Sequence, residues 1–262
     1  HSIRLDFSNL DGASRDFIVE QLRSRLVNAH YRVYEADSAP SVSDWNVHIR
    51  VAGESDGTPV GKEAYERRVT RGATDDSGSV DLLCGDPSGA LYSAMDLADE
   101  LNAGTTMAGL ANRSCEPHVA FRALKLNLPW NPYRRGGAMR AHDETMRDRA
   151  FWRELIDMLA VNRFNALTLW SLHPFHYMFR LEEYPYACEL DDDELTRWRE
   201  LWEYIFSYAK KRGVDTYMVT WNIFVSPGFA RRHDVRFDDL EYHYGSGDTR
   251  EIVKEYNRCC IR

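Results

Sequence analysis

The sequence predicts an α/β protein with a small N-terminal α/β sandwich domain, followed by the first three βα units of an incomplete (β/α)8 TIM barrel. Two observations predict this organisation. Up to residue 104, short alternating segments and two helical patterns follow one another without a regular rhythm. After residue 118, strand and helix patterns alternate, with strands expected from residues 122, 165 and 214, which are 43 and 49 residues apart. That spacing is typical of parallel strands joined by helical crossovers.

The composition limits the classes of partner. The chain has 262 residues, of which 44% are apolar and 28% charged, enough for two modest domains with buried cores. No apolar run approaches the ~20 residues that span a bilayer. Acidic residues outnumber basic ones by 41 to 33, whereas a nucleic-acid-binding protein would be expected to show a basic face. We expect neither a membrane nor a nucleic-acid partner, and the oligomeric state stays open.

The cysteines and the N-terminus carry little functional signal. The chain has five cysteines: Cys84, Cys115, Cys188, Cys259 and Cys260. They form no C-x-x-C pair and have no histidine at zinc-ligand spacing, so we interpret them as buried or incidental thiols and expect no metal. No basic and then apolar leader follows His1, so either a signal peptide has been removed or the sequence starts internally. A secreted or periplasmic location is favoured over a cytoplasmic one.

The first domain, residues 1–104, is expected to contain four strands and two helices. Apolar and polar residues alternate with the period of half-buried strands in segments 2–7, 46–51, 63–70 and 79–84. The last two segments indicate a hairpin. Apolar residues at helical spacing predict a helix over 13–29. The pair Asp86-Pro87 then supplies a capping side chain and an early proline for a second helix.

Residues 105–118 are small or polar and show no periodicity, which predicts a linker. Residues 119–262 would then form the N-terminal part of the barrel, with strands over 122–128, 165–170 and 214–221. The first helix there is expected to bury Phe151, Leu155, Met158 and Leu159. The second is expected to bury Leu195, Trp198, Trp202, Ile205 and Ala209. A third helix is expected from about Asp248 to the last residue.

The two faces of these strands favour a barrel over a doubly wound sheet. A doubly wound sheet is covered by helices on both faces, so its strands are apolar throughout. Here each strand keeps one more polar face, on which we expect Lys125, Asn127, Thr168, Trp170, Met218, Thr220 and Asn222. No glycine-rich turn follows the first strand, which excludes a dinucleotide-binding turn. A complete barrel needs ~250 residues and rarely fewer than ~200, so the 144 residues from 119 to 262 are too few to close one.

Each expected strand tip carries a tryptophan, and barrel active sites are built at these tips. Indole faces and nearby amides suit the C–H faces and hydroxyl groups of sugars; the alternative is that the indoles plug the top of the barrel. The candidate substrate-binding residues are Lys125, Asn127, Trp130, Arg134, Trp170, His173, Trp221 and Asn222. Arg134 and Arg135 would either grip a sugar carboxylate or be solvated, and His173 would either face the ligand or pack in the core.

Glycoside hydrolysis ordinarily needs two carboxyl groups beside the scissile bond. None of the three predicted strand tips supplies one. Either the catalytic carboxylates lie beyond Arg262, which we favour, or the protein is not a glycosidase. The acidic run 191–194 is explained by a solvated helix N-terminus.

Two segments resemble known glycoside hydrolases. Gly85-Asp86-Pro87-Ser88-Gly89-Ala90-Leu91-Tyr92, preceded by Glu63-Ala64-Tyr65, resembles the non-catalytic α/β domain in front of the barrel in α-glucuronidases and β-hexosaminidases. Ser93 stands where that pattern often has glycine. The segments 121–130, 151–152 and 162–165 resemble the entry of such a barrel, its first helix and the approach to its second strand.

This resemblance implies a glycoside hydrolase, and an α-glucuronidase-like protein is the first candidate. Those enzymes remove glucuronic acid side groups from xylan with inversion and without a cofactor. Their catalytic carboxylates come from strands after the third, so no catalytic residue can be assigned here, and the chain alone is expected to be inactive. The alternative from another class is a non-catalytic carbohydrate-binding or structural protein with a degenerate barrel.

Overall fold

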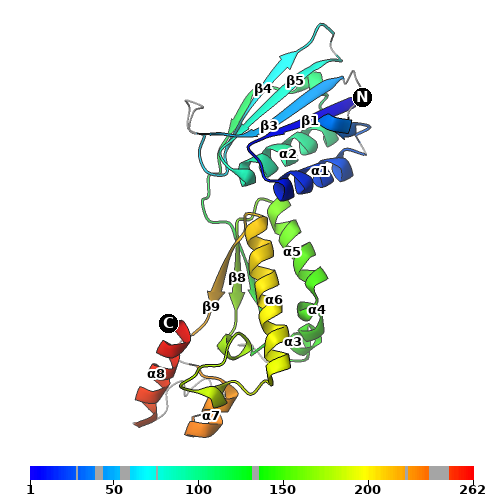
Figure 1. Cartoon of the computed structure of the whole chain (residues 1–262). Helices are drawn as coiled ribbons and strands as arrows, with labels where there is room; N and C mark the ends of the chain where they lie inside the picture. Colours follow the sequence, from blue (N-terminus) through cyan, green and yellow to red (C-terminus); the bar gives the residue numbers. More distant parts are fainter. Residues whose placement is uncertain are drawn as a thin grey trace. The chain divides into compact units, whose positions relative to one another are not determined.

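The computed structural model describes residues 1–27, 29–38, 44–53, 60–74, 76–131, 136–221, 224–235 and 248–262 (Figure 1). The chain divides into two compact units. The first unit consists of His1–Arg122, Ala160–Arg163 and Lys211–Gly213. The second consists of Ala123–Leu159, Phe164–Lys210 and Val214–Arg262. No helix among the described residues is long and apolar enough to cross a membrane.

The first unit is a six-stranded mixed sheet with two helices side by side on one face (Figure 1). Its strands are β1 (Ser2–Ser8), β2 (Arg32–Glu35), β3 (Trp45–Val51), β4 (Tyr65–Arg71), β5 (Gly78–Cys84) and β6 (Arg113–Cys115), in the order β2-β1-β3-β5-β4-β6. Its helices are α1 (Gly12–Leu26) and α2 (Pro87–Asn102), with short 3-10 turns η1 (Ala36–Ser38) and η2 (Met107–Gly109). The predicted hairpin is confirmed, because β4 and β5 pair in antiparallel fashion.

The start of α2 shows why the motif after β5 has its particular residues. Asp86 caps the helix, its Oδ1 accepting a hydrogen bond from the Gly89 amide at 2.7 Å, and Pro87 occupies the first turn, where no backbone donor is needed. At Gly89 a Cβ atom would lie 2.4 Å from the Ala64 carbonyl oxygen. Glycine therefore lets α2 approach the chain in front of β4 closely.

The segment 105–118 differs from the expected linker. It carries η2 and β6, and β6 pairs with β4 at the edge of the sheet. Met107 and Leu110 are buried, and the Asn112 side chain accepts a hydrogen bond from the Val69 amide at 2.8 Å. A three-residue strand is too short to show alternation, so composition alone could not distinguish it from a loop.

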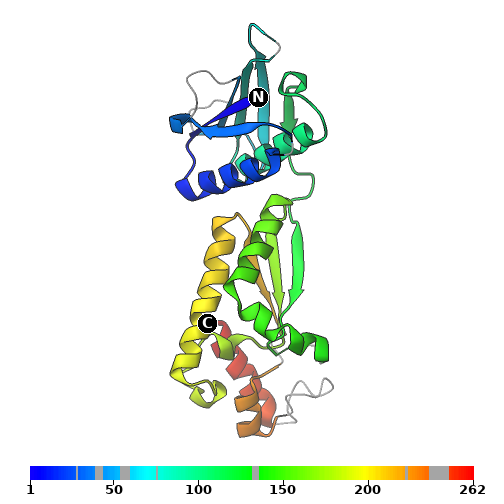
Figure 2. The ribbon, with the colours of Figure 1, turned by 90° about the vertical axis from the view of Figure 1, so that its right-hand side faces the viewer.

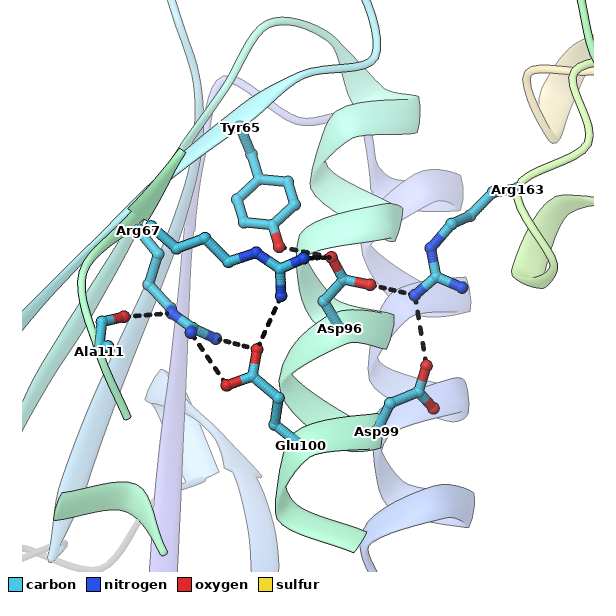
Figure 3. Close-up of polar contacts among 8 residues, drawn as sticks. Tyr65, Arg67, Asp96, Asp99, Glu100, Ala111 and Arg163 are labelled. Carbon is cyan, nitrogen blue, oxygen red and sulfur yellow. Dashed lines mark hydrogen bonds and ion pairs between the residues drawn. The ribbon is translucent and has the colours of Figure 1, made fainter. Parts of the chain in front are cut away.

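Paired charges and a hydrogen bond join β4, α2 and Arg163 within the first unit (Figure 3). Arg67, only 3% exposed, donates to both carboxylate oxygens of Glu100 at 3.0 Å. The Tyr65 hydroxyl donates to Asp96 at 2.5 Å, and Arg163, which belongs to the same unit, also binds Asp96. Because a buried charge without a partner is costly, these pairs must be kept complete.

The second unit contains three parallel strands, β7 (Ala123–Asn127), β8 (Ala166–Trp170) and β9 (Asp215–Val219), in the order β7-β8-β9. Its helices are α3 (Gly137–Ala141), α4 (Asp143–Arg147), α5 (Arg149–Val161), α6 (Asp192–Lys211), α7 (Pro227–His233) and α8 (Asp248–Ile261), with 3-10 turns η3 (Phe175–Tyr177) and η4 (Pro185–Ala187). Helices α5 and α6 cover one face of the sheet (Figures 1 and 2). The prediction of adjacent parallel strands in sequence order is confirmed, and this unit has the form of a partial barrel.

The register corrects the predicted faces of β9. Met218 lies beside Leu169 of β8, on the helix-covered side, whereas Tyr217 lies beside Thr168 and is 44% exposed. Alternation with a period of two defines two faces but not which one is covered, and only pairing with the neighbouring strand decides that. Tyr217 therefore replaces Met218 on the open face.

The buried stripe of α5 also differs from the prediction. Trp152, Ile156 and Leu159 are fully buried, whereas Met158 is 42% exposed. Trp152 can be buried because its indole nitrogen donates to the Met146 carbonyl at 2.6 Å. The stripe is thus turned by one residue from the expected one. On α6 all five predicted apolar residues are buried, so that prediction is confirmed.

Candidate functional site

The open face of the β7–β9 sheet holds most of the candidate residues that the structure describes. Strand pairing places Lys125, Thr168 and Tyr217 in one row across the three strands. The next row towards the carboxyl ends consists of Asn127, Trp170 and Val219. Lys125 and Asn127 are exposed, and Trp170 is half-buried. Parallel strands thus bring side chains from separate repeats to the end of the sheet at which barrel enzymes bind their ligands.

Lys125, Trp170 and Trp221 form a contiguous group at this end. The Lys125 ammonium lies 4.5 Å above the centre of the Trp170 ring, a cation–π contact. The Trp170 and Trp221 rings meet edge to face, with centroids 5.5 Å apart and planes at 88°. Within the described part of the chain, Lys125 makes no ion pair with a carboxylate. The group therefore offers aromatic surface together with an ammonium held in a defined place.

Trp130 is not part of this group. It is 3% exposed and packs edge-on against Trp198 and Trp202 of α6, with ring centroids 4.6 and 5.4 Å away. A third tryptophan, Trp152 of α5, lies 6.5 Å from it. Because these helices enclose its ring, Trp130 belongs to the core between sheet and helices, and we correct its expected role as a sugar platform.

His173 is likewise a core residue. It is completely buried, its Nε2 is 2.8 Å from the Tyr256 hydroxyl of α8, and its ring is stacked with His176 at 5.8 Å. Burial, with a smaller contribution from His176, holds the pKa of His173 well below its usual range, so the imidazole is neutral at pH 7. Of the two alternatives for His173, the geometry supports the packed histidine.

Other predicted residues lie outside the described part of the chain. These are Arg134, its neighbour Arg135, and Asn222. Tyr217 lies on the open face and was not among the predicted site residues. The alternation in β9 was assigned in the opposite phase, which put Met218 on the open face and Tyr217 on the covered one. Asp215 begins β9, at the end of the sheet opposite Trp170, so this acidic residue does not reach the tips. Within the described chain, no group of three or more histidine, cysteine or acidic residues is arranged to hold a metal ion.

Comparison with known proteins finds similarity in fold. No family model and no curated protein matches the chain. A solved structure of a GH138 enzyme targeting pectin rhamnogalacturonan II matches with a TM-score of 0.75 and 21% sequence identity, over 99% of this chain and 29% of that one. The chain thus spans less than a third of that protein.

Two β-hexosaminidase structures match more weakly. The Streptomyces plicatus enzyme gives a TM-score of 0.46 at 16% identity, over 83% of this chain and 40% of that one. The GH20 enzyme from Streptomyces coelicolor A3(2) gives 0.45 at 16% identity, over 83% and 41%. The similarity to the GH138 structure shows that this chain has a glycoside hydrolase-like fold.

Proposed function

We propose that this chain is the N-terminal part of a glycosidase that acts on an acidic polysaccharide. In this proposal the open face of β7–β9 forms one side of the substrate site, and the sheet β1–β6 with its helices α1 and α2 forms a non-catalytic domain. The catalytic carboxylates would come from strands beyond Arg262, so that the chain alone is inactive. The fold similarity to a glycoside hydrolase supports the enzyme class.

The observation that carries the substrate class is the Lys125 ammonium above Trp170. An ammonium on an open face, with no ion pair to a carboxylate in the described chain, favours a ligand that brings its own negative charge. The adjacent indoles supply apolar surface for a sugar ring. A uronic acid has both properties. Glucuronoxylan is our first candidate substrate, and a pectic polysaccharide, the target of the GH138 enzyme, is the second.

Binding of uronic acid oligosaccharides to variants of the full chain tests this proposal. Trp170→Ala and Trp221→Ala should each weaken binding by more than about tenfold, because stacking and buried apolar area are both lost. Lys125→Met should weaken binding of acidic oligosaccharides and spare neutral ones. Met158→Ala, an exposed change on α5, is the matched control. Unchanged affinity for the oligosaccharide in both tryptophan variants, with the fold intact, would show that the two indoles pack within the protein and do not contact the sugar.

A non-catalytic carbohydrate-binding protein is the second candidate, favoured by the absence of carboxyl groups from the described strand tips. The two candidates predict different coding sequences downstream of Arg262. Five further βα units with acidic strand tips, and turnover of aryl glucuronides by the longer protein, would support the enzyme. Turnover by the present chain alone would show that a catalytic pair lies within it and overturn the assignment of the carboxylates.

A further inference from the structure

A separate cavity of about 290 Å³ lies among the helices of the second unit, at the start of α5 and along the first half of α6. Its lining residues are Arg147, Arg149, Glu194, Arg197, Trp198, Glu200 and Leu201. These helices cover the face of the sheet opposite to Lys125 and Trp170. The cavity is therefore distinct from the proposed substrate site.

The floor of this cavity is apolar and firmly supported. Trp198 and Leu201 are both buried in α6, and Trp130 packs edge-on behind Trp198 at 4.6 Å. The Arg147 guanidinium lies 4.7 Å above the Trp198 ring, and its Nε is 3.1 Å from the Asp143 carboxylate. Ring and carboxylate together orient this guanidinium, so its remaining N–H groups form a preorganised set of donors.

Of the four other charged residues that line the cavity, two form an ion pair with each other and two form none in the described chain. Arg149 and Glu200 form an ion pair at 3.3 Å. Arg197 and Glu194 are exposed on α6, and neither makes an ion pair within the described residues. Since Arg147 is paired with Asp143 and Arg149 with Glu200, Arg197 and Glu194 are the charged lining residues that have no ion pair in the described chain. Arg197 is the cation that remains available for an added carboxylate, and Glu194 is an available acceptor for hydroxyl groups.

We propose that this cavity is a second saccharide subsite that binds one uronic acid unit outside the substrate site. Arg197 takes the carboxylate, and Glu194 and Glu200 accept hydroxyl groups. The Arg147 guanidinium, which covers the Trp198 ring, donates to the sugar oxygens. Such a subsite would hold a second part of an acidic polysaccharide. The ligand class rests on the proposed function, whereas the position of the site does not.

Indole N–H signals in NMR spectra of the 262-residue chain test this proposal, because Trp198 and Trp170 report on the two sites separately. D-glucuronate and D-glucose, which differ in the carboxylate, are the probes. We expect the Trp198 signal to titrate with glucuronate and to respond at least about threefold more weakly to glucose. Arg197→Ala should weaken the Trp198 titration by about tenfold and leave Trp170 unaffected. Arg197→Lys, which keeps the charge without the planar fork, should give an intermediate loss.

Arg153→Ala is the matched control, since Arg153 is an exposed arginine of α5 outside the cavity lining. The proposal is overturned if Trp198 does not respond to glucuronate, or if Arg197→Ala and Arg153→Ala behave alike. Trp170→Ala should leave the Trp198 titration unchanged. A response at Trp198 with none at Trp170 would contradict the proposed substrate site while supporting this subsite, so the two failures are distinguishable.

Discussion

Acidification should weaken the packing of α8 against the loop that follows β8, through the buried imidazoles of His173 and His176. Burial lowers the pKa of His176 to about 4, from the 6.5 of an exposed imidazole. The pKa of His173, whose Nε2 meets the Tyr256 hydroxyl of α8, is lowered for the same reason. A proton gained by either ring would be a buried charge. The His173 backbone favours the protonated form of His176, but burial has the larger effect.

The direction and size of the effect follow from proton linkage. Between pH 6.5 and 4 the unfolded chain binds a proton at His176 that the folded chain does not, so the free energy of unfolding falls as the pH falls. The full contribution is present above pH 6.5. With a pKa of 6.5 in the unfolded chain and about 4 in the folded chain, at about 1.4 kcal/mol for each pH unit, the full contribution is between about 3 and 4 kcal/mol. Most of it is lost by pH 4, where His176 of the folded chain is half protonated. His173 adds to this loss in the same direction.

Hydrogen exchange of the α8 amides, corrected for the intrinsic effect of pH, measures this loss. In His176→Phe an aromatic ring that cannot be protonated replaces the imidazole, so protection should fall less between pH 6.5 and 4 than in the original chain. His118→Gln, a change at an exposed histidine, is the control. It keeps both buried histidines and every carboxylate, so its α8 protection should fall as much as in the original chain. Equal loss of α8 protection in His176→Phe and the original chain would refute the reasoning.

Three further predictions concern stability and are measured by urea unfolding. Trp130→Ala should cost ~3–5 kcal/mol, because it empties a site enclosed by tryptophans, and a cost below ~1 kcal/mol would mean that the ring is not core. Glu100→Gln should cost ~3–5 kcal/mol by leaving the buried Arg67 charge unpaired, and a near-neutral result would show that water reaches Arg67. Gly89→Ala should cost ~1–3 kcal/mol, because its Cβ would collide with the Ala64 carbonyl, whereas Gly12→Ala, where a Cβ meets nothing, should cost far less.

The sequence by itself determined the larger organisation of this protein. Alternation with a period of two located β1, β3, β4 and β5, and regular spacing located β7, β8 and β9. These patterns arise because half-buried strands and helices must each present an apolar side to a core, whatever their tertiary surroundings. Sequence reasoning also brought Lys125 and Trp170 into one candidate site, since neighbouring parallel strands end at the same edge.

Only the tertiary structure decided which side of an element is covered and which tryptophan is enclosed. Tyr217 rather than Met218 lies on the open face because the register with β8 sets the phase of β9. Trp130 and Trp170 both end up at strand tips, yet the first is enclosed by α5 and α6 and the second lies beneath Lys125. Side-chain burial depends on contacts between segments far apart in the chain, and local sequence patterns do not contain that information.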